Sequence, residues 1–281
     1  MKKIGFIDFY LDEWHANNYP AMIKEIAGDE FTVAYAWAKK DAEQGMTNKQ
    51  WAEKYGVELL NSADEVVNKS DYLVVLSPDN PEEHEELCKK PFQSGKCTYV
   101  DKIFAPDRAA AMRLFELAEK HNTPVFSSSA LRFATEYGKT PKEDIDFISS
   151  WGPYEYSNYS IHQIEPIVSL MGTEVKKIMS IGTDKAPVLL LQFSDGRQAT
   201  VNMYRGDYPF EMALSYKDGQ NKHVTVQSDF FKIFIKRMLD FFRTGEPVVD
   251  KRQTTTVITI IEYGYKAFSN PGAWVGIPSI N

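Results

Sequence analysis

The first half of the chain alternates short apolar runs with segments of helical periodicity, and this alternation limits the possible folds more than any other feature. The apolar runs cover residues 3–8, 31–37, 72–76, 97–101 and 124–128. The helical segments cover residues 19–27, 48–55, 63–68, 81–94 and 106–121. Short buried strands that alternate with helices form parallel sheets with helices on both faces. We therefore predict an α/β domain over residues 1–133, with ligands beyond the carboxyl ends of its strands.

The pattern changes near residue 133, where hairpin signals such as Ser194-Asp195-Gly196 replace the strand–helix alternation. Strand-like runs cover residues 175–181, 188–193, 198–204, 211–216 and 223–227. Helical patterns cover residues 141–150, 229–244 and 253–268. Because strands joined by hairpins are antiparallel, we predict a second, α+β domain over residues 134–281 with a mostly antiparallel sheet. Its last helix could pack back on the first domain.

Composition and charge exclude several classes of protein. Hydrophobic residues make up 43% of the chain and charged residues 25%, which is typical of a globular protein. The net charge of −7 comes without a basic stripe, so we expect no nucleic-acid partner. No apolar run reaches membrane-spanning length, and Cys88 and Cys97 are too few for a disulfide framework. The first apolar run has the length of a strand rather than of a signal peptide, so we expect a soluble cytoplasmic protein.

The turn after the first strand is the most informative local sequence, because this turn commonly holds a pyrophosphate in such sheets. A G-x-G-x-x-G template laid on it places Asp8, Tyr10 and Glu13 where glycines belong. Glycines let the backbone approach the phosphates, whereas these side chains add bulk and negative charge. Two unit charges about 4 Å apart repel by roughly 4 kcal/mol at an effective dielectric constant of about 20. A dinucleotide in the ordinary pose is therefore disfavoured.

Three interpretations of this acidic turn stay open. It could be a surface loop that binds nothing. A cation or the hydroxyl groups of a polyol could instead be held by four polar side chains, Asp8, Asp12, Glu13 and His15. A dinucleotide could also bind in a displaced pose.

The end of the second strand carries a weaker cofactor signal. A carboxylate that binds the ribose of NAD is expected near Trp37, and none stands there. Lys39 and Lys40 follow Trp37 and could accept the 2′-phosphate of NADP. Lysines in a loop are more often simply solvated, so this signal does not distinguish the two cofactors.

Polar residues also follow the third and fourth apolar runs, at the same edge of the predicted sheet. Ser77, Pro78 and His84 follow the third run, and Asp101 and Lys102 follow the fourth. A lysine at this edge could orient a substrate hydroxyl and share its proton. A surface ion pair between Asp101 and Lys102 is the alternative interpretation.

Asn158, His162 and Glu165 are spaced so that a helix would place them on one face. A histidine on such a face could act as a general base toward a substrate hydroxyl. A purely structural histidine is the alternative.

Several segments, taken in order, resemble the glucose–fructose oxidoreductase, inositol dehydrogenase and MocA family (Gfo/Idh/MocA). Residues 78–84 are similar to the family's motif of Pro, Asn and a following His, and residues 99–103 are similar to its Glu-Lys-Pro motif. Residues 109–133 are similar to the family's Arg-Phe segment. Residues 158–172 are similar to its Asp-x-x-x-His helix, and residues 262–278 are similar to its closing helix. The resemblance thus extends over most of the chain.

The resemblance implies a Rossmann-like domain followed by a substrate and oligomerisation domain with a large sheet. It also implies NAD- or NADP-dependent oxidoreduction of a sugar, polyol or related small carbonyl compound, and a homo-oligomer formed through the second sheet. The family's catalytic lysine, aspartate and histidine correspond to Lys102, Asn158 and His162. Asn158 cannot take a proton as a carboxylate would, and Ile103 replaces the motif's proline. A non-catalytic ligand-binding or scaffold protein is therefore the alternative.

The candidate site residues fall into three groups, and no metal ligand is assigned. The expected catalytic residues are Lys102, His162 and Asn158. The expected cofactor-binding residues are Asp8, Phe9, Tyr10, Trp37, Ser77, Pro78 and Asp101. The expected substrate-binding residues are His84, Arg132 and Glu165.

Overall fold

The computed structural model describes residues 1–279, which divide into two compact units. Unit 1 contains Met1–Ser128 and Lys232–Asp250. Unit 2 contains Ser129–Phe231 and the described residues from Lys251 onward. The structure thus divides the chain after Ser128, where the sequence suggested residue 133, and Lys232–Asp250 returns to unit 1.

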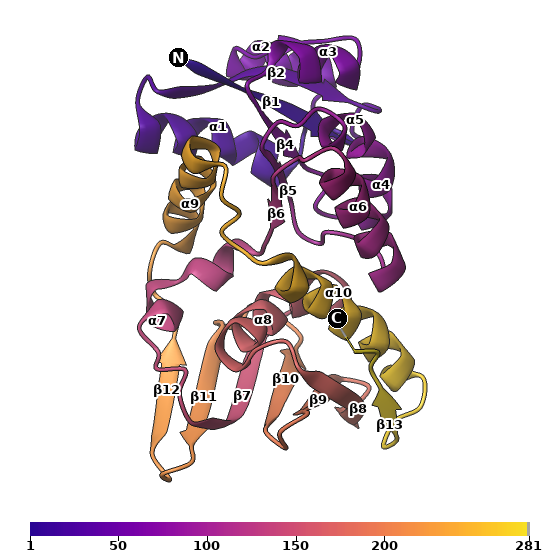
Figure 1. Ribbon diagram of the computed structural model, residues 1–281, viewed down its shortest axis with the longest axis vertical. Helices are drawn as coiled ribbons and strands as arrows, with labels where there is room; N and C mark the ends of the chain where they lie inside the picture. The colour runs from indigo at the N-terminus through magenta and orange to yellow at the C-terminus, as the bar shows by residue number, and fades with distance from the viewer. Residues whose placement is uncertain (280–281) are drawn as a thin grey trace. The chain divides into compact units, whose positions relative to one another are not determined.

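Unit 1 is built on a six-stranded sheet with strand order β3-β2-β1-β4-β5-β6 (Figure 1). All of its strand pairs are parallel. The strands are β1 (Lys2–Asp8), β2 (Phe31–Ala38), β3 (Glu58–Leu59), β4 (Tyr72–Val75), β5 (Thr98–Val100) and β6 (Val125–Ser127). The helical segments are α1 (Trp14–Ala27), α2 (Asn48–Tyr55), α3 (Ala63–Lys69), η1 (Pro81–Glu83), α4 (His84–Leu87), α5 (Lys89–Phe92), α6 (Arg108–Lys120) and α9 (Phe230–Thr244). This strand order is that of the Rossmann fold, so the predicted fold class is confirmed for this unit.

Capping residues decide where the helices of unit 1 begin. Helix α2 begins where predicted, because Thr47 forms a capping box at its start. Helix α6 begins at Arg108 because the Asp107 side chain caps it, so Pro106 precedes the helix instead of lying in its first turn. The single helix predicted over residues 81–94 is wrong, since the chain forms the short pieces η1, α4 and α5 there.

Helix α9 packs on unit 1 through aromatic side chains. The Phe234 ring lies 5.8 Å from the Tyr19 ring and 5.1 Å from the Tyr99 ring, measured between centroids. Phe242 stacks on Tyr72 at 4.8 Å. Phe234 is fully buried. This apolar face explains why α9 belongs to unit 1.

Unit 2 contains a seven-stranded sheet with strand order β12-β11-β7-β10-β9-β8-β13. The strands are β7 (Ile145–Pro153), β8 (Val175–Thr183), β9 (Ala186–Phe193), β10 (Gln198–Tyr204), β11 (Glu211–Tyr216), β12 (Asn221–Thr225) and β13 (Trp274–Gly276). The helical segments are η2 (Ala130–Phe133), α7 (Thr135–Gly138), α8 (Tyr156–Met171) and α10 (Lys251–Phe268). Among the strands of residues 129–279 only the β7–β10 pair is parallel, so the predicted mostly antiparallel sheet is confirmed.

The helix predicted over residues 141–150 is wrong, because most of this segment belongs to strand β7. Ile145 and Ile148 are fully buried, whereas Asp146 between them is exposed. Strand β7 lies in the middle of the sheet, between β10 and β11. Pairing on both edges outweighs the weak local preference that suggested a helix.

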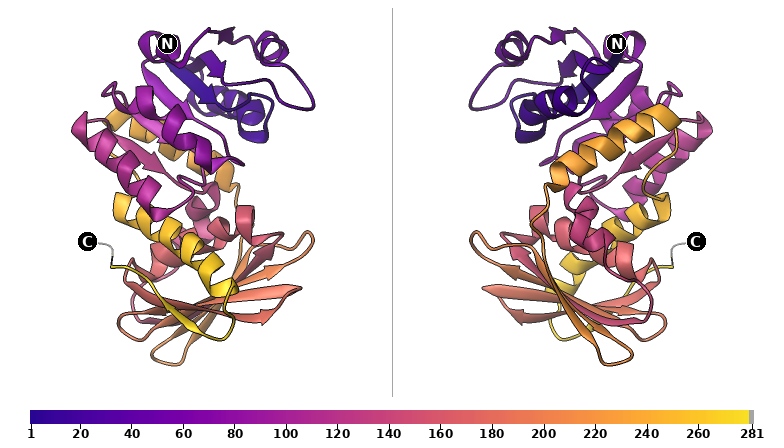
Figure 2. Two further views of the ribbon diagram at one scale, coloured as in Figure 1. Left: turned by 90° about the vertical axis from the view of Figure 1, so that its right-hand side faces the viewer. Right: turned by 90° about the vertical axis from the view of Figure 1, so that its left-hand side faces the viewer.

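Helices α8 and α10 lie on one face of the unit 2 sheet, and within the described part of unit 2 the ribbon views show no helix on the opposite face (Figures 1 and 2). The side chains that point toward the helices are buried, among them Ile178, Leu189, Leu191 and Val201. Alternate residues of the same strands are only half-buried. No helix within residues 1–279 is long and apolar enough to cross a membrane.

Candidate functional site

The turn between β1 and α1 ends in a carboxylate that caps the helix. Glu13 is the N-cap residue of α1, and its side chain accepts hydrogen bonds from the backbone amides of His15 and Ala16. Glu13 is 8% exposed. A carboxylate is stabilised at this position because the helix dipole is positive there. This cap also explains why α1 begins at Trp14, ahead of the predicted start at residue 19.

The same turn is tied to the connection between β2 and α2. Asp12 Oδ2 accepts the amide of Met46 at 2.6 Å, and Asp12 Oδ1 accepts the side-chain amide of Asn17 at 2.9 Å. The Leu11 amide donates to Asn48 Oδ1 at 3.0 Å, and Leu11 is fully buried. Asp12 therefore holds two loops together.

Asp8 lies at the end of β1 and is 1% exposed. Its Oδ1 accepts the Phe9 amide at 2.6 Å, while Oδ2 has no hydrogen-bond partner. Burial, and next the charge of Glu13, raises the pKa of Asp8 well above its usual range. Asp8 therefore belongs to the interior of the turn rather than to an acidic surface.

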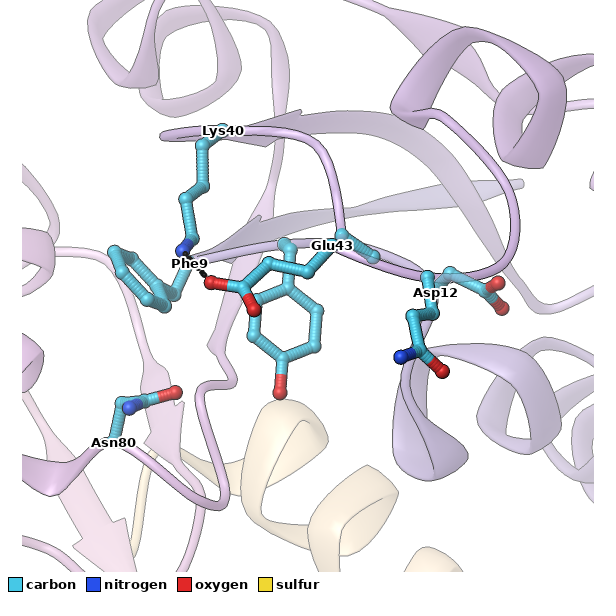
Figure 3. Close-up of a pocket in the computed structure, with 8 residues that line it drawn as sticks. Phe9, Asp12, Lys40, Glu43 and Asn80 are labelled. Carbon is cyan, nitrogen blue, oxygen red and sulfur yellow. Dashed lines mark hydrogen bonds and ion pairs between the residues drawn. The ribbon is translucent and has the colours of Figure 1, made fainter.

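An open pocket of about 440 Å³ lies beside this turn, at the carboxyl edge of the sheet (Figure 3). Residues from the loops after β1, β2 and β4 line it, and they are Phe9, Tyr10, Asp12, Lys40, Ala42, Glu43, Gln44 and Asn80. Lys40 Nζ lies 3.4 Å from Glu43 Oε1 and 4.7 Å from the centre of the Phe9 ring. The lining combines aromatic side chains with side chains of both positive and negative charge.

The expected cofactor-binding residues at this edge do not form a pyrophosphate site. The α1 amides that would bind a phosphate donate to Glu13, and Asp8 adds a second carboxyl behind them. Trp37 is half-buried at the end of β2, and Lys39 Nζ pairs with Glu83 at 2.6 Å. The residues present therefore do not fit a dinucleotide in the ordinary pose.

His15 connects this turn to the end of β5. Its Nδ1 lies 2.9 Å from Glu13 Oε2 and 3.6 Å from Asp101 Oδ2. Burial lowers the pKa of His15, but Asp101 and Glu13 outweigh burial, so the pKa is raised. Tyr99 donates to Asp101 Oδ1 at 2.8 Å. Within residues 1–279, no three His, Cys, Asp or Glu side chains are arranged to hold a metal ion, so this cluster gives no support to a cation site.

Lys102 follows Asp101 and is 7% exposed. Its Nζ lies 3.4 Å from the carbonyl oxygen of Pro78, so two of the strand-end segments predicted from the sequence do meet. Ser77, also predicted there, is buried and donates to the Asn80 carbonyl at 3.1 Å. The structure therefore places Lys102, Pro78 and Ser77 at one edge of the sheet.

His84, expected to bind substrate, is fully buried instead. Its Nε2 lies 2.7 Å from the Leu76 carbonyl oxygen, and its Nδ1 lies 3.1 Å from that of Phe104. Burial lowers the pKa of His84. With both ring nitrogens against backbone carbonyls, His84 connects two loops, and we no longer assign it to substrate binding.

In unit 2, helix α8 carries the other predicted residues, Asn158, His162 and Glu165. The Oγ of Ser129 lies 2.7 Å from His162 Nδ1, and Ser129 is fully buried. The Tyr159 ring meets the His162 ring edge to face at 5.5 Å. Asn158 is half-buried one turn before His162. The histidine ring is thus held from its Nδ1 side.

Arg132 and Glu165, both expected to bind substrate, bind each other. Arg132 Nη1 lies 2.7 Å from Glu165 Oε2, and Arg132 also donates to Gln253 on α10. Glu165 is 1% exposed. This buried ion pair joins η2, α8 and α10. Sequence reasoning missed Ser129 and Gln253, because neither residue stands in a recognisable motif.

Comparison with known proteins agrees with the resemblance. Residues 14–129 match the oxidoreductase family described as having an NAD-binding Rossmann fold, which is Gfo/Idh/MocA. The match begins at α1 and leaves out β1 and the turn that lacks the family's glycines. No curated protein matches the sequence.

Solved structures resemble the chain over nearly its full length. One is scyllo-inositol dehydrogenase from Lactobacillus casei with bound NAD(H) and scyllo-inositol, at 16% identity and a TM-score of 0.78 over 98% of each chain. Another is myo-inositol 2-dehydrogenase from Lactobacillus plantarum, at 14% identity and 0.80 over 99% of each chain. A third is a probable dehydrogenase from Thermotoga maritima, at 14% identity and 0.79 over 98% of each chain. At these identities the likeness shows the fold alone.

Proposed function

We propose that this protein acts on a small polyhydroxylated or carbonyl compound of the sugar or polyol class. In this proposal His162 exchanges a proton with a substrate oxygen. The observation that carries it is the contact between His162 Nδ1 and the buried Ser129 Oγ at 2.7 Å. A partner on one ring nitrogen fixes the ring orientation, as a general base requires. We assign the proton exchange to Nε2.

The family match supports the same substrate class, since two of the similar structures are inositol dehydrogenases. By the family resemblance, we assign Lys102 to orient a substrate oxygen. Asn158 keeps its hydrogen-bonding capacity but cannot accept a proton as an aspartate would, which leaves the base role to His162.

Nicotinamide-dependent dehydrogenation of such a compound is the second candidate function. The family's description as NAD-binding favours it, and one similar structure holds NAD(H). The cap that Glu13 forms on α1 opposes the ordinary cofactor pose. We therefore base no step of the proposed chemistry on the cofactor.

Binding of a sugar or polyol should raise the melting temperature of the purified protein. At a ligand concentration about 100 times the Kd, binding adds about 2.7 kcal/mol of stability, which corresponds to a shift of about 5–10 °C for a chain of this size. The panel should include inositols, hexoses and their keto forms, with cyclohexanol as a control that has the ring but few hydroxyls. No shift with any polyhydroxylated compound would contradict the proposal. A shift without turnover, with or without NAD(P), would favour the non-catalytic alternative.

We also propose that unit 2 forms a homo-oligomer through the sheet face opposite α8 and α10. The strand register places Met179 across from Leu190, and Trp274 across from Met179. Ile181 and Trp274 are each 39% exposed. Met179 and Leu190 are half-buried, and apolar side chains that stay partly exposed on three neighbouring strands are typical of an interface.

Leu190→Glu should convert the oligomer to a monomer, because a carboxylate buried at an interface without a partner is costly. Light scattering after size exclusion measures the mass of each species. Lys185→Glu, in the turn after β8, is the matched control and should keep the oligomer. A wild-type protein that stays monomeric at high concentration would contradict the assignment.

A further inference from the structure

The amides at the start of α1 are occupied by the protein's own carboxylate. Glu13 has an extended backbone, with φ −134° and ψ 167°, and its side chain turns back over the first helical turn. Oε1 accepts the Ala16 amide, and Oε2 accepts the His15 amide at 2.8 Å. The Asn17 amide donates to the Glu13 carbonyl at 2.9 Å. Two amides that could face an anion therefore donate to the Glu13 carboxylate, and the Asn17 amide makes the first ordinary bond of the helix.

We infer that the Glu13 carboxylate takes the place of a dinucleotide pyrophosphate, so that this chain excludes NAD and NADP from the α1 N-terminus. A carboxylate and a phosphate compete for the same donors and the same positive end of the helix dipole. The inference does not depend on which sugar or polyol the protein recognises.

The turn is held so that Glu13 stays over these amides. Asp12 accepts the Met46 amide at 2.6 Å, and the Leu11 amide donates to Asn48 at 3.0 Å. Glu13 Oε2 also lies 2.9 Å from His15 Nδ1, which adds a charge-assisted contact. A pyrophosphate would have to displace Glu13 from two amides and an imidazole.

If a pyrophosphate displaced the Glu13 carboxylate, the interior of the turn would not stabilise the displaced charge. Asp8 is 1% exposed and its Oδ2 has no hydrogen-bond partner, so the interior of the turn already contains one poorly solvated carboxyl group. Burial and the Glu13 charge raise the pKa of Asp8, which shows how unfavourable a second negative charge is there. The Tyr10 side chain lines the neighbouring pocket and adds bulk where the template has a glycine.

Titration calorimetry with NAD⁺, NADP⁺ and NADH tests the inference directly. Glu13→Ser removes the charge and the bulk but keeps a good N-cap. The triple variant Asp8→Gly/Tyr10→Gly/Glu13→Ser also opens the turn. Glu53→Gln, on the exposed face of α2, removes one negative charge elsewhere in unit 1 and is the matched control.

We expect no heat of binding for the wild type and the control, and binding of at least one dinucleotide by the triple variant. The affinity should rise by at least about tenfold, which is about 1.4 kcal/mol. Wild-type protein that binds as tightly as the triple variant would overturn the inference. So would a folded triple variant that binds nothing. If the triple variant does not fold, Glu13→Ser alone decides in its place, because it removes the charge and the bulk and keeps a good N-cap.

Discussion

Replacement of Arg132 by leucine should lower the free energy of unfolding of unit 2 by about 3–5 kcal/mol. Arg132 Nη1 lies 2.7 Å from Glu165 Oε2, and Glu165 is 1% exposed. Leucine leaves that carboxylate in the interior without its cationic partner, and this desolvated charge is the source of the loss. Amide hydrogen exchange along α8 and α10 reports the stability of unit 2 by itself.

Two control variants distinguish the destabilisation caused by an unpaired buried charge from that caused by the loss of an ion-pair contact. The double variant Arg132→Leu/Glu165→Leu removes both charges and should lose less stability than Arg132→Leu alone. Arg113→Leu breaks an exposed ion pair with Glu85 and should change the stability much less than Arg132→Leu, because solvent screens exposed pairs. If Arg132→Leu cost no more than Arg113→Leu, the ion pair would not stabilise unit 2 as we describe.

This ion pair also limits what the sequence could reveal about the site. The sequence placed Glu165 on a helical face with Asn158 and His162, and the structure confirms that helix. It could not show that Glu165 points at Arg132, which lies in η2 and outside the helix. An ion pair between separate elements depends on tertiary packing, which periodicity does not report. The sequence predicts both residues as substrate ligands, and the structure adds that they form an ion pair with each other.

The sheets were predictable because their signals are local. Strands β10 and β11 begin and end where the turn sequences and alternating apolar residues placed them. Strand β7 was missed because its pairing with β10 and β11 comes from distant segments. Strand β13 pairs with β8 at the edge of the sheet. It is only three residues long, which is too short to show any periodicity in the sequence.

For the turn between β1 and α1, too, the sequence predicts one feature and leaves another to the structure. The absence of glycines at Asp8, Tyr10 and Glu13 was visible in the sequence and indicated an altered cofactor loop. The sequence did not show that Glu13 caps α1, because Glu is not among the preferred N-cap residues. The Glu13 carboxylate both repels a phosphate and occupies the amides that would bind one. Both effects oppose a dinucleotide in the ordinary pose, and calorimetry measures their sum.

His162→Gln should reduce the rate of the reaction on the bound compound by about 10²–10⁴-fold, the usual contribution of a general base. Glutamine fills a similar volume and can still bond to Ser129, but it cannot exchange a proton. The substrate's Kd should therefore change little while kcat falls, and steady-state kinetics combined with calorimetry separate the two. A loss of binding alone would assign His162 to recognition.

Ser129→Ala distinguishes a positioned base from a histidine that merely lies nearby. It removes the partner 2.7 Å from Nδ1, and we expect a fall in kcat that is smaller than that of His162→Gln. Tyr159→Phe keeps the ring that meets His162 at 5.5 Å and is the matched control, with no expected change in kcat. If His162→Gln kept the full rate, the base would have to be sought elsewhere. The proton exchange assigned to α8 would then be wrong, whatever compound the protein binds.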